Sequence, residues 1–309
     1  MKSGKHAISG NWASLLLPIE ADDNIEFNKL GDEIDILVDA GVDGIYSNGT
    51  AGEFHNQTEE EFDKIQFVLA ERCQRAGMPF IIGACQPDPA IMLNRVRRAA
   101  SHMPAAIQVI LPDWWPLTDS EAIDFLNRAS DTASGIPLIL YNPPHAKRVL
   151  ASTELATILA SAPGVTGVKL ADGGKDWYAD ARAHLHGVSL FVPGHHLATG
   201  VNEGVAAGSF SNVACLSPGG AQRWTDLMQT DIGVALEIEQ RICRFMDEHI
   251  VPFRQNLGYS NAALDKLLAA VGNWGPVGTR LRFPYRWIPD SEAERLRGIA
   301  KQELSEIII

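Results

Sequence analysis

PFIIGACQPDPAIMLNRVRRAASHMPAAIQVILP, residues 79–112, contains the repeating unit that decides the fold. Its two ends, PFIIGA (79–84) and AAIQVILP (105–112), are short continuous apolar runs. Such runs are typical of parallel strands that are covered on both faces. The segment between them, PAIMLNRVRRAASH, is predicted to be a helix. A strand, a helix and a second strand make one βαβ unit.

The same alternation continues along most of the chain and predicts eight strands with helices between them. The other six strand candidates are WASLLLP (12–18), DGIYS (43–47), PLILYNPP (137–144), VTGVKL (165–170), VSLFVPG (188–194) and SFSNVAC (209–215). Eight βα units in this length predict an α/β fold, the (β/α)8 TIM barrel. A doubly wound open sheet is the alternative, but no GxGxxG follows the first strand, which weakens a dinucleotide-binding fold.

The last part of the chain is predicted to be helical. GVALEIEQRICRFMDEHIVPF and NAALDKLLAAVG carry apolar residues at three- and four-residue intervals. No linker rich in serine, glycine or charge separates this part from the rest. We therefore expect a barrel over residues 1–217 and C-terminal helices over 218–309 that pack on it as a single structural unit.

Composition limits the partners of this chain of 309 residues. A formal net charge of −12 makes it a poor candidate for binding nucleic acid or an anionic membrane surface. No apolar run approaches the length of a spanning helix, and MKSGKHAISGNW at the start lacks the pattern of a secretory signal. The four cysteines are widely spaced, without a CxxC, which indicates reduced thiols and neither a zinc site nor a redox pair. We expect a cytoplasmic protein.

One lysine stands out among the apolar residues of GVKLADG (167–173). In such barrels the active site lies at the C-terminal ends of the strands, and Lys169 ends the sixth predicted strand. Desolvation there lowers the pKa of the amine toward neutrality, and a neutral amine can attack the ketone of a 2-keto acid to form a Schiff base. The alternative is a lysine that extends to solvent or pairs with Asp172.

Two further strand ends carry polar groups that suit this chemistry. In GTAGE (49–53), Gly49 and the residues after it predict a turn whose backbone N–H groups bind an anion such as a carboxylate. Tyr141, at the end of the fifth strand, has a hydroxyl that can relay protons. An ordinary tight turn and a core tyrosine with one satisfied hydroxyl are the alternatives.

Other residues at the strand ends leave their roles open. Trp114 and Trp115 offer flat faces for a sugar or aromatic substrate, or for a subunit contact. His195 and His196 either bond substrate hydroxyls or are histidines with satisfied nitrogens, and no third ligand close in sequence supports a metal site. For Glu53 we favour a structural role in which its carboxylate bonds nearby backbone amides.

The motifs GTAGE (49–53), YNPP (141–144) and GVKLADG (167–173), in this order and spacing, resemble the dihydrodipicolinate synthase / N-acetylneuraminate lyase family of Schiff-base aldolases. WWPLTDSE (114–121) is also similar to a segment of the lyase branch. The resemblance covers roughly residues 12 to 300. It implies a (β/α)8 barrel with C-terminal helices, a homo-oligomer (usually a tetramer), and no metal or organic cofactor.

The resemblance also implies roles for individual residues. Lys169 would form the Schiff base with pyruvate or another 2-keto acid, and Tyr141 would be the phenol that relays protons. Thr50, with the backbone N–H of Ala51, would hold the carboxylate of the keto acid. Phe210, in SFSN, would lie near the segment whose backbone lines the same pocket.

Three departures from the synthase pattern concern the second substrate. Trp114 occupies the position of a tyrosine that a neighbouring subunit contributes to the relay, and Ala51 replaces a second threonine. Ala146 stands where the synthase has an arginine that holds the carboxylate of the second substrate, although Lys147 and Arg148 follow it. These departures weaken the case for condensation with aspartate semialdehyde.

The leading hypothesis is therefore a Schiff-base lyase, an aldolase or a dehydratase, that acts on pyruvate or a sugar-derived 2-keto acid. The alternatives are dihydrodipicolinate synthase proper and a non-catalytic relative that binds a keto acid. A nucleotide-dependent α/β enzyme is a third class, but the chain has no phosphate-binding loop.

Overall fold

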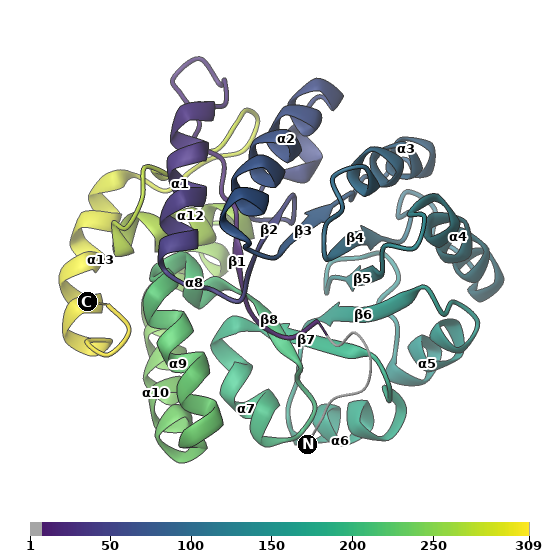
Figure 1. Ribbon diagram of the computed structural model, residues 1–309. Helices are drawn as coiled ribbons and strands as arrows, with labels where there is room; N and C mark the ends of the chain where they lie inside the picture. Colours follow the sequence, from purple (N-terminus) through teal and green to yellow (C-terminus); the bar gives the residue numbers. More distant parts are fainter. Residues whose placement is uncertain (1–7, 309) are drawn as a thin grey trace.

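The protein is a closed barrel of eight parallel strands that neighbour one another in chain order, from β1 round to β8 and back to β1. The computed structural model describes residues 8–308. Residues 1–7, which include more than half of the segment considered for a secretory signal, and Ile309 lie outside that range. In Figure 1 the strands form a central ring, with helices around it. The prediction of a (β/α)8 barrel is confirmed.

Every predicted strand is present, but the prediction of the first over 12–18 is wrong, because it begins at Gly10 and ends at Ser14. The other strands, except the eighth, differ only slightly at their ends. The strands are β1 (Gly10–Ser14), β2 (Gly44–Ser47), β3 (Phe80–Gly83), β4 (Ala106–Ile110), β5 (Leu138–Asn142), β6 (Val165–Leu170), β7 (Ser189–Pro193) and β8 (Gly208–Ser211). The prediction that the eighth strand continues to Cys215 is wrong. The hydroxyl of Ser211 accepts a hydrogen bond from the amide of Ala214 and so caps a helix that begins directly after the strand.

Helices connect the successive strands, and one more helix follows the eighth strand. They are α1 (Phe27–Asp39), α2 (Glu59–Ala76), α3 (Pro89–Ala100), α4 (Asp119–Thr132), α5 (Ser152–Ala160), α6 (Lys175–His184), α7 (Leu197–Asn202) and α8 (Asn212–Leu216), with short 3-10 turns η1 (Phe54–Asn56) and η2 (Gly194–His196). Thr58 and Thr118 each form a capping box at the start of a helix. These local signals explain why the helix starts could be read from the sequence.

The inside of the barrel is filled by large side chains from almost every strand. One buried cluster contains Trp12, Tyr46, Ile81, Ala106, Ile139, Phe191 and Phe210. β2 begins with a glycine because a Cβ on Gly44 would lie 2.2 Å from the indole of Trp12. The barrel is therefore packed through its centre, and open space is left only near its ends.

The chain after the barrel is helical, as predicted. It forms α9 (Pro218–Thr230), α10 (Ile232–Phe245), a π-helical turn η3 (Met246–Ile250), α11 (Val251–Gln255), α12 (Asn261–Gly272) and α13 (Asp290–Glu303). α12 packs against α8 and α13, and α8 packs against β1, so the C-terminal helices lie directly on the barrel (Figure 1). Among the described helices, none has both the length and the apolar character of a membrane span.

Candidate active site

Lys169 ends a buried strand and projects into a cage of three aromatic rings. It pairs in register with Tyr141 on β5 and with Phe191 on β7. Its Nζ lies 5.1 Å from the ring centre of Tyr46, 4.3 Å from that of Tyr141 and 4.9 Å from that of Phe210. The aromatic faces stabilise an ammonium only weakly compared with water or a carboxylate.

No ion pair or hydrogen bond to the amine of Lys169 is found within residues 8–308. The alternative partner, Asp172, instead accepts hydrogen bonds from the hydroxyl of Tyr178 and from Nδ1 of His196. The Lys169 side chain is only partly buried, because it lines a pocket, yet protein atoms surround its amine. This desolvation lowers the pKa of Lys169 from 10.5 to about 8, although the charge of Asp265 opposes the shift. A substantial fraction of the amine is therefore neutral near pH 7.

The hydroxyl groups of Tyr141 and Thr50 lie beside each other at the same end of the barrel. Burial raises the pKa of Tyr141 to about 12, although contact with the Thr50 hydroxyl partly offsets this rise. The Thr50 hydroxyl oxygen is buried and has no regular hydrogen-bond partner in the described part of the chain. A buried hydroxyl without a partner is costly, and it is available to a bound substrate.

The GTAGE loop has an irregular backbone, as predicted for an anion-binding turn. Asn48, just before the loop, and Glu53, its last residue, have left-handed φ angles of 53° and 50°. Within residues 8–308, the N–H groups of Thr50 and Ala51 donate to no protein acceptor. Gly49 is buried against the ring of Tyr46, where a Cβ would come within 2.5 Å, and it does not line the pocket. Thr50 and Ala51, the next two residues of the loop, have free amides and line the pocket.

Glu53 has structural contacts on both carboxylate oxygens. Its Oε1 lies 2.9 Å from Nζ of Lys266, and its Oε2 accepts a hydrogen bond of 3.1 Å from the amide of Arg282. The side chains of Glu53 and Lys266 are almost completely inaccessible to solvent. The ion pair therefore joins the loop beneath the candidate site to α12.

The cavity in front of Lys169, here called the lysine pocket, has a volume of about 310 Å³. Its barrel side contains Thr50, Ala51, Tyr141, His195 and Phe210, which are five of the residues singled out from the sequence. Nδ1 of His195 lies 2.9 Å from the side-chain amide of Asn212, and burial lowers the pKa of this histidine to about 4. A neutral imidazole at this position can bond a substrate hydroxyl.

The opposite side of the lysine pocket comes from the C-terminal helices and was not predicted. Arg254 on α11, and Asn261 and Asp265 on α12, line the cavity together with apolar residues such as Leu264 and Leu268. Burial raises the pKa of Asp265 to about 7, although the charge of Lys169 opposes the rise. The only signal in the sequence was one acidic residue within the apolar pattern of NAALDKLLAAVG.

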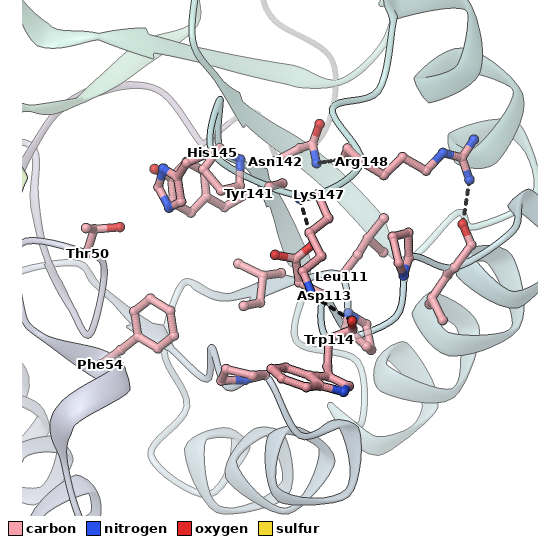
Figure 2. Close-up of a pocket in the computed structure, with 17 residues that line it drawn as sticks. Thr50, Phe54, Leu111, Asp113, Trp114, Tyr141, Asn142, His145, Lys147 and Arg148 are labelled. Carbon is pink, nitrogen blue, oxygen red and sulfur yellow. Dashed lines mark hydrogen bonds between the residues drawn. The ribbon is translucent and has the colours of Figure 1, made fainter.

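A second cavity, here called the tryptophan pocket, opens beside the first and shares Thr50 and Tyr141 with it. Figure 2 shows Trp114 at its edge, on the far side from Thr50. The side chain of Trp114 is 85% exposed, and Nζ of Lys147 lies 4.6 Å from its ring centre. Trp114 therefore faces the tryptophan pocket and solvent, not Lys169.

The basic residues of the tryptophan pocket already have protein partners. Nζ of Lys147 donates to the carbonyl of Trp114 at 2.7 Å. The guanidinium of Arg148 donates to the carbonyl of Leu117 and pairs with Asp119 and Glu154, as part of this network in Figure 2 shows. Ala146, between them and Tyr141, offers no charge.

A lysine without an ion-pair partner in residues 8–308, a tyrosine and free loop amides lie around one small cavity of a TIM barrel, an arrangement typical of small-molecule sites in this fold. The family model for the dihydrodipicolinate synthetase family matches residues 7–302, and the chain belongs to that family.

Individual relatives agree with this assignment. The chain is 25% identical over 299 residues to a 4-hydroxy-tetrahydrodipicolinate synthase of Pseudomonas putida, which covers 96% of this chain and 98% of that one. It is 24% identical over 167 residues to an N-acetylneuraminate lyase of Salmonella paratyphi B, which covers 54% and 56% of the two chains. Among solved structures, YagE, a prophage protein of E. coli K12 in complex with pyruvate, matches with a TM-score of 0.81 at 20% identity over 96% and 98% of the chains. This last likeness concerns the fold alone.

Proposed function

We propose that this protein is a Schiff-base-forming lyase, an aldolase or a dehydratase, that acts on pyruvate or a sugar-derived 2-keto acid through Lys169. The observation that carries the proposal is the amine of Lys169, which has no anionic partner in the described part of the chain and lies among three aromatic rings at one end of the barrel. Desolvation keeps part of this amine neutral, as a nucleophile must be.

In the proposed reaction the carboxylate of the keto acid binds the free amides of Thr50 and Ala51 and the hydroxyl of Thr50. This position brings the C2 ketone toward Nζ of Lys169, which attacks C2 and forms an imine after loss of water. The protonated imine withdraws electrons from the neighbouring carbon, so that a bond to C3 or beyond it can break. The hydroxyl of Tyr141 relays protons during these steps.

The remaining predicted residues shape the rest of the substrate site. Phe210 provides one aromatic wall, and Gly49 gives the ring of Tyr46 room to form another. His195 faces the outer part of the lysine pocket, where the hydroxyls of a sugar-derived tail would lie. An apolar cavity with a few polar groups at fixed places is the usual form of a small-molecule site.

The contacts around the tryptophan pocket disfavour dihydrodipicolinate synthase proper. That reaction needs a cation for the carboxylate of aspartate semialdehyde. Ala146 has none, while Lys147 and Arg148 are held by protein carbonyls and carboxylates. A second substrate with a carboxylate would have to break these bonds.

The exposed faces of Trp114 and Trp115 support a homo-oligomer, either a tetramer or a dimer. Their side chains are 85% and 82% exposed and adjoin each other, which is unusual for large apolar groups in a monomer. Light scattering of the protein and of a W114S/W115S variant tests this part of the proposal. A monomeric wild-type protein would remove it.

The experiment that tests the function is reduction of the imine. The protein is incubated with pyruvate and sodium borohydride, and its intact mass and peptide map are measured. A reduced pyruvyl adduct on Lys169 is expected. A folded protein that gives no adduct with pyruvate or with a panel of longer 2-keto-3-deoxy sugar acids would contradict the proposal and favour a relative without this chemistry.

A further inference from the structure

The lysine pocket contains a carboxyl group that the reaction outlined above does not use. Asp265 lies on α12, outside the barrel strands, and lines the same cavity as Lys169, Tyr46 and Tyr141. Within residues 8–308 no hydrogen bond or ion pair to its side chain is found. The next residue, Lys266, is buried on another side of the helix and pairs with Glu53. Two adjacent charged residues of α12 therefore have opposite surroundings.

A structural role does not explain Asp265. Its neighbours Leu264 and Leu268 on α12 are apolar and line the same pocket, and Asn261 is the polar residue one turn earlier. A carboxyl group that is partly withdrawn from water and has no partner is destabilised in its charged form. The helix itself gains nothing from the side chain, because Ser260 already caps the start of α12.

Asp265 and Lys169 line the same cavity, so both side chains can act on one bound substrate. The charges of the two groups affect each other, yet they form no ion pair. Both groups line one cavity of about 310 Å³, which has room for a small keto acid.

We infer that Asp265 is a catalytic acid–base residue, which gives and takes the protons that imine formation between Lys169 and the C2 ketone requires, while the Tyr141 hydroxyl assists these transfers by hydrogen bonding to the C2 oxygen. This inference rests on the function proposed above. It adds a group from the C-terminal helices to chemistry that otherwise involves the barrel alone.

The proton transfers balance as follows. The neutral amine of Lys169 adds to C2, the C2 oxygen takes a proton from the Asp265 carboxylic acid, and the extra proton on nitrogen passes to the carboxylate so formed. Asp265 then returns this proton to the C2 hydroxyl, which leaves as water while the nitrogen lone pair forms the C=N bond. The products are a positive iminium and a negative carboxylate that faces it.

The pKa values of Asp265 and Tyr141 support a role for Asp265 as the group that gains and loses a proton. Burial raises the pKa of Asp265 to about 7, so both forms are present near neutral pH, where acid–base catalysis is most efficient. Burial raises the pKa of Tyr141 to about 12, so the phenol remains protonated there. The titratable or charged groups that share the pocket or affect these two are Lys169 on β6, Tyr46 on β2, Cys85 after β3, His195 on η2, Cys215 on α8 and Arg254 on α11.

The test compares rates of imine formation with pyruvate, measured by rapid quenching into borohydride between pH 5.5 and pH 9. The variants are D265N, D265E and, as a matched control, D124N, which removes an exposed carboxylate of α4. We expect D265N to label the same lysine about 100-fold more slowly at pH 7 and to keep only the pH dependence that comes from the amine of Lys169. D265E should regain part of the rate, and D124N should match the wild type.

Each other outcome has a clear meaning. If D265N does not fold, D265A replaces it, because alanine suits a helix, and the same slowing is expected. Labelling of D265N or D265A at the wild-type rate and with the wild-type pH profile would overturn the inference while the proposed function stands. Failure of the wild-type protein to form any adduct would remove the proposed function and the role of Asp265 together.

Discussion

Two lysines of this protein, Lys169 and Lys266, are both withdrawn from water, and their surroundings differ completely. Lys266 is fully buried, lies 2.9 Å from the carboxylate of Glu53 and donates to the carbonyl of Arg280. Lys169 has no such partner and is surrounded by aromatic rings at the edge of a cavity. Burial lowers the pKa of both amines, but only in Lys266 do specific contacts hold the charged form in place.

The comparison shows that burial alone does not mark a reactive lysine. A buried ion pair fixes two segments relative to each other, and here it ties the GTAGE loop to α12. A lysine without an anion can lose its proton and can reach a substrate. The four experiments below change one lysine or its surroundings at a time, in order of the size of the expected effect.

Replacement of Lys169 by alanine should abolish the reaction without destabilising the fold, which is the largest effect expected. We expect K169A to give no detectable adduct with any 2-keto acid, because the nucleophile is gone. Its free energy of unfolding should not fall, because the change removes a buried ammonium without a partner. Mass spectrometry and urea unfolding measure the two effects, with K301A as the control for a lysine on α13. Turnover by K169A would contradict the mechanism.

Replacement of Lys266 by methionine should have the opposite result. It leaves the carboxylate of Glu53 buried without a counterion, which costs about 3–5 kcal/mol of unfolding free energy. The double variant E53Q/K266M should recover part of this loss, because no charge then remains in the interior. Urea unfolding curves of the three proteins provide the comparison. A loss below about 1 kcal/mol in K266M would mean that the pair is not important for stability.

The pH dependence of labelling distinguishes Lys169 from ordinary lysines. Because its pKa is lowered to about 8, the amine loses its proton as the pH rises through 8, and reactivity should increase tenfold per pH unit below that value and then level off. At pH 7 the neutral fraction is about 300-fold larger than for a lysine with a pKa of 10.5. Peptide-resolved labelling with an amine reagent measures this. A midpoint near 10.5 would show that desolvation is weak at this site.

Removal of the phenol hydroxyl from Tyr141 tests the barrel side of the pocket. We expect Y141F to slow imine formation by about 100-fold while Lys169 remains the labelled residue. Y285F, at a partly exposed tyrosine that rests against His55, is the matched control. An unchanged rate in Y141F would assign Tyr141 to packing and leave Asp265 as the acid–base group of the pocket.

The sequence predicts the barrel side of this site well, because the signals are local. Each strand end follows a short apolar run, so Thr50, Tyr141 and Lys169 could be placed at one end of the barrel before any contact was known. His195 was found in the same way, whereas Phe210 was implied by the family resemblance, and both line the pocket.

The helical side of the pocket could not be predicted, because it depends on tertiary packing. Asp265 is nearly a hundred residues from Lys169 in sequence, and the periodicity of α12 does not reveal which face meets the barrel. The pairing of Lys266 with Glu53 has the same origin. The eighth strand was predicted to end at Cys215 and ends at Ser211. The reason is that Asn212–Leu216 is apolar enough to continue a strand, and only the serine cap indicates a helix.

The most direct test of the account is a crystal structure of the protein with pyruvate. We predict continuous density between Nζ of Lys169 and C2 of pyruvate, with the carboxylate on the amides of Thr50 and Ala51 and with Asp265 facing the new bond. Pyruvate bound without a covalent bond to Lys169, and with its carboxylate turned toward Arg254, would contradict it.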